Sequence, residues 1–119
     1  MRYALLIYAD QSSWAELSHE SKAELRAEEM PRWISAMEEL MKADPGMSGY
    51  ELDEGATAKV VRVRDGERIV TDGPFAETKE ILGGAFLIEA SDLDEAIRLA
   101  ALVPTAAHGS LEIRPIQAN

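Results

Sequence analysis

Two short stretches of almost continuous apolar sequence set the strongest limit on how this chain can fold. Residues 2–8 are rich in Tyr, Leu and Ile, and residues 85–88 read Ala-Phe-Leu-Ile after a Gly-Gly pair. A strand with one face in water alternates apolar and polar residues, whereas a strand buried on both faces is apolar throughout. Both stretches are therefore expected to be central strands of a sheet that needs cover on both faces.

Two segments have the periodicity of amphipathic helices. Residues 20–43 place an apolar residue at every third or fourth position, and Pro31 interrupts this pattern without changing its phase, so one kinked helix is predicted. A second helix is predicted after Ser91-Asp92, which has N-cap character. Ser13 and Glu16 have capping-box spacing for a short helical turn before the long helix. The predicted core stripes are Ala23, Ala27, Met30, Ile34, Met37 and Met41 in the first helix, and Leu93, Ala96, Ile97 and Ala100 in the second.

The middle of the chain predicts a β-hairpin over residues 58–72. Residues 59–64 alternate valine with arginine, as in a half-exposed strand, and Asp65-Gly66 is a strong signal for a tight hairpin turn. A short strand is expected over residues 47–52. A last strand over residues 110–116 should lie at a sheet edge, because Pro115 limits its pairing.

The order of elements is β-α-β, hairpin, β-α-β within a chain of 119 residues, which fits one domain. We therefore expect an α+β fold, a ferredoxin-like split βαβ with an inserted β-hairpin, over residues 1–119. Right-handed crossovers place both helices on one face of the sheet. The rest of the sequence has no apolar segment long enough to cover the other face, so a homodimer with facing sheets is predicted.

Composition excludes several classes of function. The chain has no cysteine, which removes disulfides, thiolate nucleophiles and sulfur metal ligands. Its formal charge of −10 argues against nucleic-acid binding, and no apolar run approaches the length of a membrane span or a signal peptide. The protein is expected to be cytoplasmic. Two distant histidines make a poor metal site, and no cofactor-binding motif is present.

The charge-dense stretch from Val70 to Glu80 holds the main candidate for chemistry, Asp72. An aspartate before glycine commonly bonds the backbone amide two residues on, but here that residue is Pro74, which has no N–H. The carboxylate must then bond the amide of Phe75 or a group elsewhere. If it faces an apolar rim near Phe75, desolvation would suit it to general acid–base work. The structural and the catalytic readings have equal weight.

Four other residues are candidates for ligand binding, each with a simpler alternative. Lys79, between Glu77 and Glu80, could clamp an anion or be a solvated lysine among acids. Arg114 could anchor a carboxylate or phosphate in a dimer cavity, or pair with an acid across the sheet. Tyr8, at the end of a central strand, and Phe75 would line a pocket. No metal site is predicted.

The same stretch carries a resemblance to a known family. The run from Thr71 to Glu80, followed by Gly83-Gly84 and by Glu112-Ile113-Arg114-Pro115-Ile116, is similar to the DGPF branch of the YCII-related proteins. The similarity extends to residues 3–8 and 94–96. It implies a dimeric α+β barrel of ferredoxin-like protomers. It also implies a His–Asp pair in which Asp72 matches the Asp, although residues 20–43 contain no His.

Two functions are compatible with these observations. The first is a small-molecule enzyme that uses Asp72 as acid or base in a dimer pocket. The second is a non-catalytic ligand-binding or accessory dimer. The resemblance links this second function to extracytoplasmic-function sigma factors, beside which DGPF proteins often occur.

Overall fold

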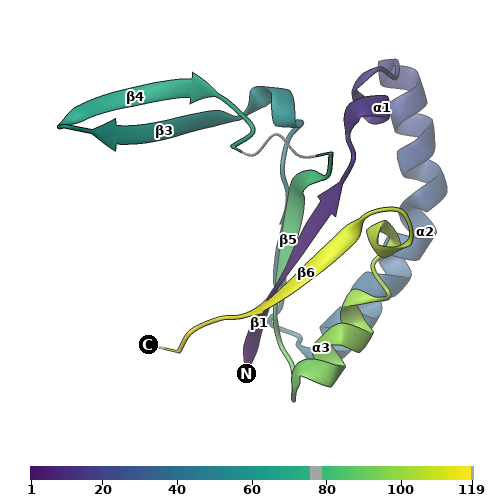
Figure 1. The fold of residues 1–119 in the computed structure, drawn as a ribbon. Coiled ribbons are helices and arrows are strands. Elements are labelled where there is room, and N and C mark those ends of the chain that lie inside the picture. Colours follow the sequence, from purple (N-terminus) through teal and green to yellow (C-terminus); the bar gives the residue numbers. More distant parts are fainter. Residues whose placement is uncertain (76–78, 119) are drawn as a thin grey trace.

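The computed structural model describes residues 1–75 and 79–118 and contains one four-stranded sheet, one separate β-hairpin and two main helices (Figure 1). The elements are, in chain order, β1 (Arg2–Ala9), α1 (Ser12–Ala15), α2 (His19–Ala43), β2 (Ser48–Glu51), η1 (Gly55–Thr57), β3 (Lys59–Arg64), β4 (Glu67–Asp72), β5 (Ile81–Glu89), α3 (Leu93–Ala100), η2 (Pro104–Ala107) and β6 (Ser110–Pro115).

The main sheet is antiparallel and has the strand order β2-β5-β1-β6. The two apolar stretches are its central strands, as the sequence predicts, and β6 is an edge strand. Both α2 and α3 lie on the same side of this sheet (Figure 1). The predicted α+β class, the two central strands and the one-sided helix layer are therefore confirmed for a single chain.

The hydrophobic core lies between the sheet and the helices. On β1 the side chains of Tyr3, Leu5 and Ile7 are buried and face the helices, while the residues between them are partly exposed. Leu5 lies opposite Phe86 in the sheet register, so β5 contributes to the same layer. The buried core cluster comprises Tyr3, Leu5, Ile7, Leu40, Phe86, Ile88, Ala90, Ala96, Leu99, Ala100 and Val103.

The helix α2 forms where predicted and runs through Pro31 as one element, but it turns a different face to the core. Ser18 is its N-cap and accepts a hydrogen bond from the Ser21 amide at 3.1 Å. Ala36 and Leu40 are the buried residues. The predicted stripe is wrong in this helix, because its large members are exposed: Met30 by 48%, Ile34 by 50%, Met37 by 40% and Met41 by 50%.

The wrong stripe has a physical cause. The helix carries a second apolar row of Trp33, Ala36, Leu40 and Ala43, which also recurs at helical spacing and packs on the core. Periodicity identifies apolar rows but does not say which row meets the sheet. In α3 the predicted stripe is wrong for only part of its residues, as described next.

Helix α3 is capped by Asp92, whose side chain accepts a hydrogen bond from the Glu95 amide at 2.8 Å. Ala96, Leu99 and Ala100 are buried, while Leu93 and Ile97, both predicted core residues, are 48% and 49% exposed. The short helix α1 follows Gln11 and begins at Ser12, so the predicted Ser13 cap is also wrong.

The hairpin of β3 and β4, residues Lys59–Asp72, is named the arm. Its turn residues Asp65 and Gly66 have φ values of 51° and 78°, the left-handed conformation that an Asp-Gly hairpin turn requires. The strands form a sheet of their own that projects from the body (Figure 1). The expected half-burial is wrong, because Val61 and Val63 are 60% and 62% exposed.

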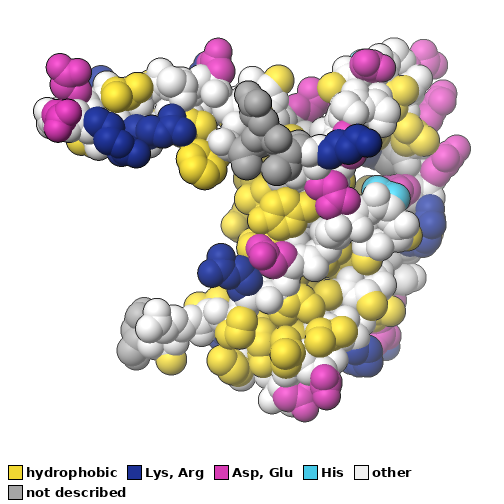
Figure 2. Space-filling view, viewed as in Figure 1, with side chains coloured by type: hydrophobic (Ala, Val, Ile, Leu, Met, Phe, Trp, Pro, Cys, Tyr) yellow, Lys and Arg dark blue, Asp and Glu magenta, His cyan; other side chains and the backbone are white. Residues whose placement is uncertain are grey.

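The side of the main sheet away from the helices is named the open face. In the sheet register Leu6 lies opposite Ala85 and Glu112, and Ala4 lies opposite Leu87 and Arg114. The arm projects on this same side, so the molecule has a hollow outline (Figure 2). The open face comprises Ala4, Leu6, Tyr8, Leu82, Ala85, Leu87, Glu112 and Arg114.

A pair of alanine substitutions in α2 tests which row meets the core. Leu40→Ala should lower the free energy of unfolding by about 2–5 kcal/mol, because Leu40 is fully buried. Met41→Ala removes a side chain that is 50% exposed and should cost less than about 1 kcal/mol. Urea denaturation of both variants measures the difference, and equal costs would contradict the assigned helix face.

Candidate functional site

Asp72 is the last residue of β4 and lies opposite Lys59 in the arm. Its carboxylate accepts a hydrogen bond from the Lys59 ammonium, so of the two partners that the sequence left open, the Phe75 amide and a group elsewhere, the structure shows the second. The two side chains are 82% and 63% exposed. A single chain therefore does not desolvate Asp72. A role as catalytic acid or base requires another protein surface to cover this carboxylate.

Phe75 follows the arm and is 77% exposed. The guanidinium of Arg62 lies 5.6 Å from the centre of its ring, at cation–π distance. Arg62 is opposite Ile69 in the hairpin register, so it projects from the face of the arm opposite to that of Lys59 and Asp72. Phe75 thus belongs to an exposed cationic surface.

Tyr8 and Glu112 form a polar pair on the open face. The Tyr8 hydroxyl donates a hydrogen bond of 3.4 Å to Glu112 Oε1, bringing together residues 104 positions apart in sequence. Sequence reasoning missed Glu112 as a site residue. The signal was the alternation of β6, which places Glu112 on the face opposite Leu111 and Ile113.

Arg114 lies two residues beyond Glu112 on the same strand face, opposite Ala4 of β1. It is exposed, and no carboxylate of residues 1–75 or 79–118 makes an ion pair with it. Its surroundings on the face are largely apolar. Arg114 is therefore a cation with an unused capacity for a bidentate anion.

Lys79 is exposed and lies near the end of β1. The pKa of Asp10 is lowered mainly by the hydrogen bond that the Ser12 hydroxyl donates to its carboxylate, and the charge of Lys79 adds a smaller lowering. Glu80 accepts a hydrogen bond of 2.8 Å from the Ser110 hydroxyl. The predicted clamp also included Glu77, which lies outside the described residues.

The structure thus brings the predicted residues together in two groups. Tyr8 and Arg114 share the open face, and Lys79 lies near the end of β1 that carries Tyr8. Asp72 and Phe75 belong to the arm and its exit. Basic side chains gather along the side of the arm that borders the hollow (Figure 2).

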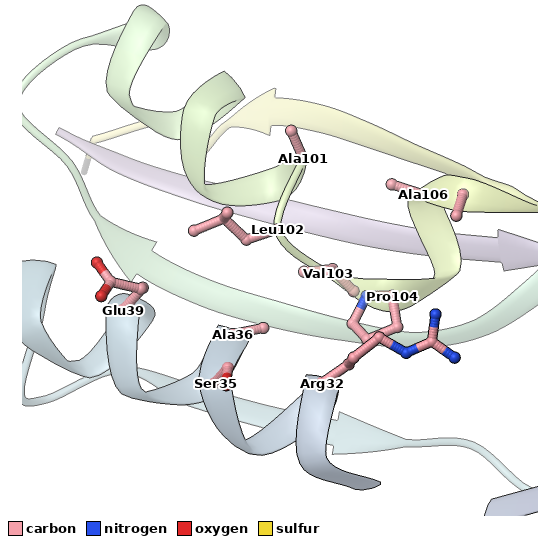
Figure 3. Close-up of a pocket in the computed structure, with 10 residues that line it drawn as sticks. Arg32, Ser35, Ala36, Glu39, Ala101, Leu102, Val103, Pro104 and Ala106 are labelled. Carbon is pink, nitrogen blue, oxygen red and sulfur yellow. The ribbon is translucent and has the colours of Figure 1, made fainter. Parts of the chain in front are cut away.

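A separate cavity of about 550 Å³ lies on the helix side of the molecule, between α2 and the segment around η2 (Figure 3). Small apolar residues dominate its lining, and Arg32 and Glu39 are its charged members. None of the predicted site residues lines it.

These features define an α+β protein whose antiparallel sheet has one helix-covered face and one open face with a polar rim. Residues 1–118 match the YCII-related domain, and the chain belongs to this family. An uncharacterized protein from Rhizobium meliloti (strain 1021) is 38% identical over 120 residues, covering 98% of this chain and 92% of that protein. Within the described residues, no helix is long and apolar enough to cross a membrane.

Proposed function

We propose that two copies of this chain pair through their open faces and bind a small molecule with a carboxylate or phosphate group between them. Arg114 is the anchor of that group. The observation that supports this proposal is a cation without an acidic partner, set among apolar side chains on a sheet face that the described residues leave uncovered.

The pairing follows from the apolar character of the face. Leu6 and Leu87 are partly exposed there, and Leu82 is 39% exposed. A two-fold interface presents the same patch on both subunits, so a continuous apolar sheet face is suited to itself. Two sheets that pack face to face lie about 10 Å apart and fill that space with interdigitating side chains, so a ligand would bind at the polar rim and not between the sheet centres.

The anion follows from what pairing would do to Arg114. Removing a guanidinium from water is costly unless a carboxylate or phosphate accepts its hydrogen bonds. Glu112 of the same chain accepts a long hydrogen bond from the Tyr8 hydroxyl and, within the described residues, makes no ion pair with Arg114. A ligand anion would accept the hydrogen bonds of Arg114. The alternative partner is Glu112 of the second copy, and the ligand test below distinguishes the two.

The pairing predicts a specific effect of charge on the open face. Leu87→Asp should convert a dimer into a monomer, because it places a carboxylate in the buried centre of the interface. Leu93→Asp on α3 is the matched control, since Leu93 is 48% exposed on the helix side and should leave the dimer intact. Sedimentation at micromolar concentration measures both, and a monomeric wild type would contradict the pairing.

The anchor role predicts a ligand response that depends on Arg114. In a thermal-shift panel of small carboxylates and phosphates, a ligand at 100 times its Kd should stabilise the wild type by about 2.7 kcal/mol. Arg114→Gln should abolish that response and leave the dimer folded. Arg98→Gln, an exposed arginine on α3, should keep it. If Arg114 instead pairs with Glu112 of the second copy, no panel member stabilises the wild type.

A second candidate is catalysis by Asp72. The observation that favours it is the direct contact between the Asp72 carboxylate and the Lys59 ammonium, a proton acceptor and a proton donor held opposite each other by the hairpin register. Cover by a second copy would exclude water from the pair and so strengthen the electrostatic interactions that assist acid–base catalysis. The carboxylate would then act as the base.

This candidate predicts turnover that depends on Asp72. A ligand found in the thermal-shift panel should be converted by the wild type, as followed by NMR, and Asp72→Asn should reduce the rate by at least about 100-fold. Asp53→Asn, in the loop after β2, is the matched control and should retain the rate. A ligand that binds but stays unchanged would assign the protein to binding without catalysis.

A further inference from the structure

We propose that the arm binds the helix layer of a second copy, with Arg62 and Arg64 against the glutamates of the partner's α2. The inference rests on the proposed pairing of open faces. The arm contact would be a second contact surface between the two copies. It lies outside the ligand site and would stabilise the dimer.

The arm lacks the support that a folded hairpin normally has. An isolated two-stranded hairpin is marginally stable in water, because neither face is buried. Val61 and Val70 lie opposite each other and are 60% and 54% exposed, and Val63 on the same face is 62% exposed. These valines lie on the face of the arm opposite to that of Arg62 and Arg64, so within the described residues the arm has no packed core of its own and its stability depends on a contact made by the arginine face.

The direction and length of the arm identify a second copy as that partner. The arm projects on the side of the open face, away from α2 and α3 (Figure 1). Its strands have six residues each and span roughly 20 Å at about 3.3 Å per residue. A partner sheet would lie about 10 Å away, so the arm extends past that sheet to the level of the partner's helices.

The charge of the arm complements the rest of the chain. Residues 59–72 hold four of the 12 Lys and Arg but three of the 22 Asp and Glu, so the arm carries a formal +1 and the remainder −11. Arg62 and Arg64 lie on one face of β3 by alternation, and neither makes an ion pair within the described part of the chain. Their natural counterpart is an acidic protein surface.

Helix α2 presents such a surface. Glu20, Glu24 and Glu28 follow one another at four-residue spacing, so three like charges are neighbours on one helix face, an arrangement that destabilises a helix. The cations beside them are engaged elsewhere, because Lys22 pairs with Glu54 and Arg26 pairs with Glu51. In the described residues these three glutamates have no ion pair. Arginines from a partner's arm would remove the repulsion.

A charge-swap series tests this contact in the full-length protein. Arg62→Glu with Arg64→Glu should weaken the dimer by about tenfold, as expected when two exposed ion pairs become repulsive, and should reduce the salt dependence of dimerisation. Adding Glu24→Lys and Glu28→Lys should restore both. Arg98→Glu on α3 is the matched control and should change the dimer Kd little. Sedimentation at low and high salt measures each Kd, and circular dichroism verifies the fold.

The outcomes separate this inference from the proposal on which it rests. A wild-type dimer that Leu87→Asp dissociates, but that both arm variants leave unchanged, would overturn the arm contact while the paired open faces stand. A weakened arm variant that the charge swap does not rescue would overturn the assignment to α2. A monomeric wild type would overturn both proposals.

Discussion

The structure depends on one imbalance: the central strands β1 and β5 are apolar on both faces, but the helices cover one face. Burial of apolar surface is the main force that stabilises a small domain, so the covered face supplies the core. Leu5, Leu40 and Ile88 are fully buried there. The other face carries leucines and alanines at similar spacing, and the described residues form no second layer over them. The remaining features of the molecule are arranged around that uncovered face.

The distribution of charge follows the same division. The chain is strongly acidic, yet Arg114 lies on the open face and basic side chains of the arm border the hollow beside it (Figure 2). Acids on the helix side make several ion pairs with neighbouring cations. The cations of the arm and the glutamates of α2 have opposite charge but do not pair within the described part of one chain. They could pair between two chains. This separation is the physical reason for proposing both an anionic ligand and an arm contact.

The local elements could be predicted well because their signals are short-range. The Asp65-Gly66 turn has the conformation its residues demand, and Pro115 ends an edge strand. The site was harder. Glu112 came next to Tyr8 through a strand pairing that joins the two ends of the chain, and no local pattern reports such a pairing. The sequence correctly predicted that Asp72 makes no hydrogen bond to the backbone two residues on, because Pro74 has no N–H. Its partner, Lys59, is set by the hairpin register, which the sequence alone did not identify.

The sequence by itself determined the order of the strands and α-helices, the two central strands and the family to which the chain belongs, because periodicity, turn chemistry and a long motif are written in consecutive residues. The tertiary structure alone decided which apolar row of α2 faces the sheet, since two rows are equally periodic and only docking distinguishes them. It also decided that the arm leaves the body with both faces exposed. Alternation in the sequence indicates that the two faces of a strand differ in polarity. Whether one face is buried depends on whether another part of the protein packs against it.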